Sequence, residues 1–171
     1  MERKGDYWCG ISTFVYDKEM INEILLENIR LLNRNKDKIS DCIIQKRWVF
    51  GPHIRLLIKV NSQEDGEEVE SLLMEEIRDI ISEFSNMEVP VDYEHQEKLS
   101  SRVALLENYK GEYLPLKEHL SVVYEQVDLS LVDTIYDYNT YLQLEKLKTG
   151  FLKEIYEFYY YLPPRKRDIF L

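Results

Sequence analysis

Residues 48–60 read WVFGPHIRLLIKV, two apolar runs that a Gly-Pro pair separates. Glycine and proline together are a strong turn signal, so Gly51-Pro52 predicts the turn of a β-hairpin. In the run that follows, every second side chain is aliphatic, and this alternation indicates a strand that turns one face towards a core. The face turned away from that core then carries the remaining side chains: His53, Arg55, Leu57 and Lys59.

The segments on either side of this turn predict more of the core. Residues 42–50 form the first strand of the hairpin, and residues 53–60 form the second. Upstream, the aromatic and β-branched residues 7–16 predict another strand. Asp17 then caps a helix of about 17 residues, because apolar side chains recur there at helical spacing. Downstream, Val69–Phe84 has the pattern of an amphipathic helix.

The order strand, helix, strand, strand, helix is most of a ferredoxin-like, split βαβ unit. Two further short strands are predicted at Val89–Val91 and Leu120–Val127. We therefore predict an α+β fold, with a ferredoxin-like split βαβ core, a β-hairpin at residues 42–60 and a long C-terminal helix. One apolar stripe of this helix would contain Leu144, Leu147, Phe151, Ile155, Phe158 and Leu162. A length of 171 residues suits one domain, so residues 1–171 are predicted to form a single domain.

The chain is acidic, with a formal net charge of −10. A negative field repels phosphate backbones, so nucleic acid is not a predicted partner. The two cysteines, Cys9 and Cys42, lie in apolar, strand-like runs and are predicted to be buried free thiols. The sequence contains neither the apolar core of a signal peptide nor a run of about 18 apolar residues. We therefore expect a cytoplasmic protein without a membrane span.

Motifs of the familiar enzyme classes are missing from the sequence, which has no Gly-rich phosphate loop, GxSxG, HExxH or CxxC. The three histidines, His53, His95 and His119, do not fall at metal-ligand spacing. No metal and no cofactor is therefore predicted. Glu94, His95 and Glu97 could supply acid–base groups, although a polar helix surface explains these three residues equally well.

Arg55 is the most informative single residue of the chain. Its guanidinium group would project from the sheet face opposite the aliphatic side chains, and it suits two-pronged recognition of a carboxylate or phosphate. His53 and Lys59 would lie on the same face and could add a proton donor and a second positive charge. The alternative is an exposed sheet face whose cations form ordinary salt bridges, and spacing alone favours this alternative.

The hairpin also resembles a known family. Residues 48–56, WVFGPHIRL, resemble the paired-strand motif of the C-terminal, SpaB-like domain of lantibiotic dehydratases. The same domain type occurs in thiopeptide-type bacteriocin biosynthesis proteins. Residues 111–116, GEYLPL, and the following residues 121–124, SVVY, look like a stretch found in some members. The resemblance extends over about residues 7–127 and also includes the order of strands and helices.

The resemblance implies modification of ribosomally made peptides by lyase-like chemistry. In the family, this is elimination of glutamate from glutamylated serine or threonine, or formation of a pyridine ring with loss of the leader peptide. Arg55 would bind the anionic group of a leader-bearing precursor peptide, His53 would be catalytic beside it, and Arg102 lies where another family arginine falls. Leu57 stands where many members carry a second arginine. A further histidine, used by the family in elimination, has no equivalent in this chain.

Three functions remain open at this point. The first is a biosynthetic enzyme, or a subunit of one, that modifies a ribosomally made peptide; a partner from the same pathway or a second copy would then complete a half-domain. The second is a non-catalytic subunit that binds a peptide or a partner protein within a bacteriocin biosynthesis complex. The third is an unrelated ferredoxin-like protein that shares only the short strand motif.

Overall fold

The computed structural model describes residues 7–60, 63–87, 89–106, 109, 111–127 and 138–161. The chain divides into two compact units, residues 1–128 and residues 129–171. The first unit contains the sheet and the helices that pack on it. Among its described residues, the second unit contains one helix. The expectation that residues 1–171 form a single domain stays a prediction.

Within the described residues, four strands form one sheet in the order β2-β3-β1-β4. They are β1 (Tyr7–Phe14), β2 (Asp41–Arg47), β3 (His53–Val60) and β4 (Val122–Val127). All neighbouring strands are antiparallel, so β1 and β2 run parallel to each other with β3 inserted between them. This is the split βαβ arrangement of a ferredoxin-like fold. The predicted α+β class and its hairpin are confirmed.

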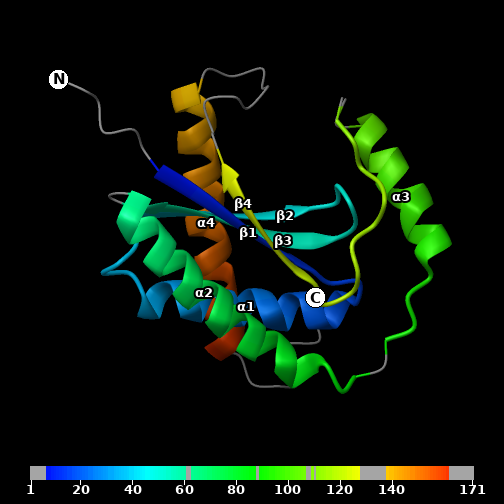
Figure 1. The fold of residues 1–171 in the computed structure, drawn as a ribbon, viewed down its shortest axis with the longest axis horizontal. Helices are drawn as coiled ribbons and strands as arrows, with labels where there is room; N and C mark the ends of the chain where they lie inside the picture. The colour runs from blue at the N-terminus through cyan, green and yellow to red at the C-terminus, as the bar shows by residue number, and fades with distance from the viewer. Residues whose placement is uncertain are drawn as a thin grey trace. The chain divides into compact units, whose positions relative to one another are not determined.

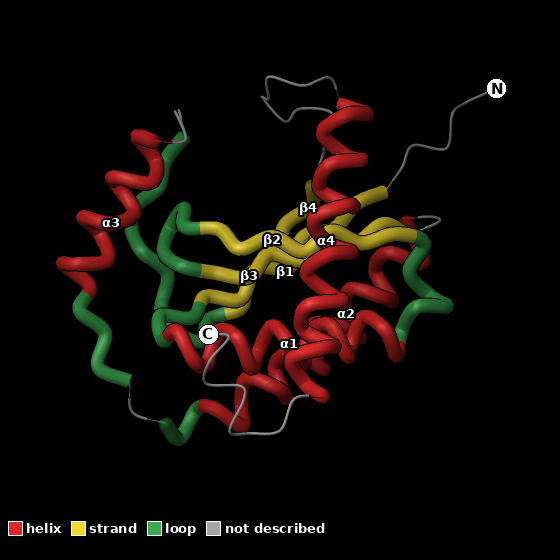
Figure 2. Tube along the Cα trace, turned by 180° about the vertical axis from the view of Figure 1, so that it is seen from behind, coloured by secondary structure: helices red, strands yellow, loops and turns green. Residues whose placement is uncertain are grey.

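Two helices, α1 (Lys18–Arg34) and α2 (Gln63–Phe84), cover one face of the sheet (Figures 1 and 2). The α1 helix begins where predicted, because the Asp17 carboxylate accepts a hydrogen bond from the backbone N–H of Met20 at 2.7 Å. Each of the two helices buries one apolar stripe, and both stripes pack against the aliphatic face of β1 and β3. Their fully buried side chains include Ile24, Leu25, Ile29, Leu73 and Ile77.

The turn between β2 and β3 differs from the prediction, since β2 ends at Arg47 and not at residue 50. Phe50 and Gly51 have φ angles of 63° and 111°, a left-handed conformation that no strand accommodates. Residues 48–51 instead close a turn in which the Gly51 N–H donates to the Trp48 carbonyl at 3.0 Å. The consequence is a bend that carries Trp48, Val49 and Phe50 out of the plane of the strands.

A third helix, α3 (Tyr93–Leu106), lies beyond this turn at the end of the sheet (Figure 1). The sequence indicated a polar helix surface at Glu94, His95 and Glu97 but not the bounds of the helix, because few of its side chains are apolar at helical spacing, and only Ser100 and Ala104 are buried. The Ser100 hydroxyl donates to the Trp48 carbonyl at 3.1 Å and ties α3 to the turn. The strand predicted at Val89–Val91 is wrong: these residues form no strand, and Pro90 lacks the N–H that a ladder needs.

The helix α4 (Tyr138–Tyr161) belongs to the second unit and accounts for the predicted C-terminal helix. Its predicted apolar stripe is present over the described residues and is exposed; it consists of Leu144, Leu147, Phe151, Ile155 and Phe158. Leu162, which was predicted to extend this stripe, lies outside the described residues. Among the helices described here, none combines the length and the apolar character that crossing a membrane requires.

Candidate functional site

The face of the sheet opposite α1 and α2 carries the predicted polar residues in two rows. Strand pairing places Arg47 and Phe14 on either side of His53. In the next row, Gln45 and Ser12 lie on either side of Arg55. Directly paired residues point to the same face, so both rows lie on one surface. All members of these rows except Gln45 line a cavity of about 310 Å³. The cavity is lined by Ser12, Phe14, Arg47, Val49, Phe50, His53, Arg55, Tyr109, Lys117 and Val123.

The wall of this cavity consists of the turn at residues 48–51 and of residues 113–117, which are hydrogen-bonded to that turn. The Phe50 N–H donates to the Tyr113 carbonyl at 3.2 Å, and the Lys117 N–H donates to the Phe50 carbonyl at 2.9 Å. The Lys117 ammonium lies 5.7 Å from the centre of the Phe50 ring, within cation–π range. The turn therefore brings Lys117 to the same cavity as Arg55, although 62 positions separate them in the chain.

His53 is buried at the centre of this arrangement, with 6% of its surface exposed. Its Nδ1 atom lies 2.9 Å from the Gly51 carbonyl oxygen. A carbonyl oxygen only accepts, so Nδ1 carries the proton and the lone pair lies on Nε2. The ring also packs on Phe14, with centroids 4.6 Å apart. Burial lowers the pKa of His53 to about 4, and the charges of Arg55 and Arg47 act in the same direction. The imidazole is therefore neutral at pH 7.

The charges around the cavity have one sign. Arg47, Arg55 and Lys117 line it, and no carboxylate occurs among the described residues that do so. This local positive charge contrasts with the net charge of −10 of the whole chain. Two guanidinium groups and an ammonium group are suited to a carboxylate or phosphate, because they combine charge with directed hydrogen bonds. A neutral imidazole beside them can accept a proton.

The structure brings two of the predicted site residues together and places two elsewhere. His53 and Arg55 line the cavity. Lys59 lies on the same face but four residues further along β3, about 13 Å away at the rise of a strand, where it pairs with Trp8 and Asp41. Arg102 is exposed on α3 and does not line this cavity. The substrate-binding roles of Lys59 and Arg102 stay predictions.

The remaining histidines are not part of this site. His95 is exposed on α3, with Glu94 and Glu97 exposed beside it. His119 accepts a hydrogen bond at Nδ1 from the Tyr16 backbone N–H at 3.2 Å. No group of side chains suited to hold a metal ion is found in the part of the chain that the structure describes.

The sequence did not assign Arg47, Tyr109 or Lys117 to the site, although all three line the cavity. The signal for Arg47 was misleading, because the predicted turn at Gly51-Pro52 would pair Arg47 with Leu56 on the opposite face, whereas the observed turn pairs it directly with His53. Tyr109 and Lys117 had none. Lys117 reaches the cavity through its hydrogen bond to Phe50, 67 positions away in the chain, and the Tyr109 N–H donates to the Ala104 carbonyl, so that the chain turns at the end of α3. No local sequence pattern predicts either position.

Comparison with known proteins identifies a solved structure with a similar fold. No family model and no curated protein matches the sequence. Among solved structures, the pyridine synthase TbtD from thiomuracin biosynthesis is similar, with a TM-score of 0.70 over 90% of this chain and 15% sequence identity. The chain shares the fold of this enzyme. It spans about half of TbtD, 48% of its length, so the similarity concerns only that part of the enzyme.

Proposed function

We propose that this chain takes part in the maturation of a ribosomally made peptide, and that its sheet-face cavity binds an anionic group of that peptide. One observation carries the proposal: Arg47, Arg55 and Lys117 line one cavity with the neutral His53, and the described residues add no carboxylate to its lining. The fold shared with TbtD and the resemblance of residues 48–56 to lantibiotic dehydratases support the same class of substrate.

The chemistry that fits this cavity is elimination from a glutamylated serine or threonine. The Nε2 atom of His53 would take the α-proton while the bond between Cβ and the ester oxygen breaks. A double bond forms between Cα and Cβ, and glutamate leaves with a new carboxylate. Arg47, Arg55 and Lys117 would stabilise the negative charge on this leaving group, because all three line the cavity in which it would develop.

Mass spectrometry tests this function. A candidate precursor peptide is glutamylated, incubated with the chain and with proteins of its pathway, and examined for a product lighter by one glutamic acid. We expect Arg55→Ala to slow product formation by about 10²–10³-fold, the usual cost of removing one group that stabilises developing charge. Arg78→Ala is the matched control, because Arg78 is exposed on α2, which covers the opposite face of the sheet.

A non-catalytic role in peptide binding is the second candidate, and one observation favours it. The pKa of His53 is lowered to about 4, and such an imidazole is a weak base for an α-proton. In that case the peptide binds, its mass does not change with any partner present, and Arg55→Ala still weakens its binding. If the precursor neither binds nor changes mass, both candidates are refuted.

A further inference from the structure

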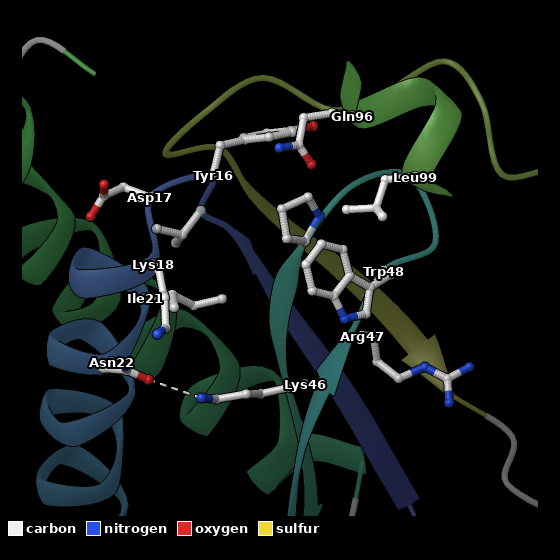
Figure 3. Close-up of a pocket in the computed structure, with 12 residues that line it drawn as sticks. Tyr16, Asp17, Lys18, Ile21, Asn22, Lys46, Arg47, Trp48, Gln96 and Leu99 are labelled. Carbon is white, nitrogen blue, oxygen red and sulfur yellow. Dashed lines mark hydrogen bonds between the residues drawn. The ribbon is translucent and has the colours of Figure 1, made fainter. Parts of the chain in front are cut away.

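A second cavity lies on the other side of the turn between β2 and β3, and no function has so far been assigned to it. Its volume is about 230 Å³, and it is bounded by the start of α1, the end of β2 and the helix α3 (Figure 3). Arg47 lines both cavities. In Figure 3 its guanidinium group points away from the other labelled side chains, in keeping with its position on the opposite sheet face.

The walls of the second cavity are mainly apolar. Ile21, Trp48, Pro52 and Leu99 contribute to them. Trp48 exposes 37% of its surface there, whereas the other tryptophan, Trp8, exposes 2%. A half-exposed indole beside aliphatic side chains offers a ligand a large apolar contact area, and indole rings are common at such sites.

A positive charge lies at the edge of this cavity, on a lysine that is exposed to solvent over part of its surface. The Lys46 ammonium donates to the Asn22 side-chain oxygen at 2.9 Å (Figure 3). Partial burial lowers the pKa of Lys46. Lys18 also lines the cavity, and Asp17 supplies the only carboxylate among the lining residues described, where it caps α1. An anionic ligand would therefore be attracted here despite the acidity of the chain.

A third feature concerns hydrogen bonding. The side-chain oxygen of Gln96 is buried beside this cavity and accepts no hydrogen bond from the residues that the structure describes. A buried acceptor without a donor costs free energy, and such groups are rare in folded proteins. A backbone N–H of a bound peptide is a donor of the kind that would satisfy this oxygen.

We propose that the second cavity is a specificity subsite for a peptide: it holds one aromatic or branched aliphatic side chain next to an aspartate or glutamate. This inference rests on the proposed function, since the same peptide would present its reacting residue to the first cavity. β2 is an edge strand, so a peptide can pass around it from one sheet face to the other. Arg47 lines both cavities, so the apolar residue and the reacting one would lie only a few positions apart in that peptide.

Nuclear magnetic resonance of the two ¹⁵N-labelled tryptophan indoles tests the subsite. The chain contains only Trp8 and Trp48, and Trp48→Phe assigns the two signals. The probe is N-acetyl-phenylalanyl-aspartyl amide, compared with its alanyl-aspartyl and phenylalanyl-lysyl counterparts. We expect the phenylalanyl-aspartyl probe to shift the Trp48 signal saturably and to leave that of Trp8 in place. The alanyl probe should bind at least about tenfold more weakly, because it buries far less apolar surface.

Two variants examine the polar contacts. Lys46→Met keeps the length of the side chain and should abolish the preference for the aspartyl over the lysyl probe. Gln96→Leu, on the half-exposed side of α3, should weaken binding of the phenylalanyl-aspartyl probe by about two- to tenfold through loss of one hydrogen bond. Equal binding of all three probes, or no shift of Trp48, overturns the inference. A Trp48 signal that moves when the protein alone is diluted would assign the cavity to a second copy and would also overturn it.

The outcome separates this inference from the function on which it rests. If Trp48 is unmoved while the precursor peptide is still modified in an Arg55-dependent manner, the subsite is refuted and the proposed function stands. If the probe binds as expected while the precursor peptide neither binds nor changes mass, the subsite stands and the proposed function is refuted. Arg55→Ala should leave binding of the probe unchanged, because Arg55 does not line the second cavity.

Discussion

Replacing Gly51 by alanine should destabilise the turn that builds both cavities. Gly51 has a φ of 111°, where a side chain strains the backbone by about 1–3 kcal/mol. A Cβ there would also collide with the Tyr16 hydroxyl group and come within 2.9 Å of the Tyr16 ring at Cζ. That hydroxyl group donates to the Lys117 carbonyl at 2.7 Å, and loss of this bond adds about 1 kcal/mol. We expect the free energy of unfolding to fall by about 2–4 kcal/mol.

Urea unfolding followed by tryptophan fluorescence measures this loss. Gly150→Ala is the control, because a Cβ at this exposed position of α4 meets nothing within 4 Å and helix propensity should make the change neutral or favourable by up to about 1 kcal/mol. Tyr16→Phe removes the colliding oxygen, so Gly51→Ala should cost about 1 kcal/mol less in that background. An unchanged unfolding midpoint for Gly51→Ala, or strict additivity with Tyr16→Phe, would refute this reasoning.

Three further predictions concern single side chains. The pKa of His53 is about 4 in the folded chain and near 6.5 in an unfolded one, so its neutral form stabilises the fold above pH 6.5. Between pH 7.5 and pH 4 this contribution is lost, and the stability of the wild type should fall by about 3 kcal/mol more than that of His53→Phe in urea titrations. Burial raises the pKa of the Cys9 thiol to about 11, so a Cys42→Ser variant should release no colour with a disulfide reagent at pH 8 until denaturant is added. Asp17→Ala should lower stability by about 1 kcal/mol through loss of the cap on α1, whereas Asp17→Asn should cost only a few tenths, and equal losses in thermal melts would contradict the capping role.

Periodicity explains which parts of the fold were predictable. Aliphatic side chains alternate along β3, and its bounds, His53–Val60, agree with the prediction. The helix α1 was found because Asp17 caps it and its apolar residues recur every three or four positions. The bounds of α3 were not predicted, because its sequence lacks such a recurrence of apolar residues. It buries only two small side chains and is held by a hydrogen bond to the turn, so its sequence carries no amphipathic signal.

The first turn of α2 shows a second limit of local patterns. The polar residues before Val69 suggest a loop, yet α2 begins at Gln63. Acidic side chains near a helix N-terminus are favoured by the helix dipole and need no apolar face. Tertiary contact with the sheet through the later turns then supplies the stability that the first turn lacks.

The sequence by itself determined that His53 and Arg55 share one face of a strand, because side chains alternate along an extended backbone whatever surrounds it. Only the tertiary structure decided whether that face is exposed or lines a cavity, and which charges surround it. Burial lowers the pKa of His53, and hydrogen bonds from Phe50 and Lys117 across the turn add a third cation and enclose the cavity. Lys117 lies 64 positions away from His53 in the chain, and a contact at such separation depends on packing and not on local residue order.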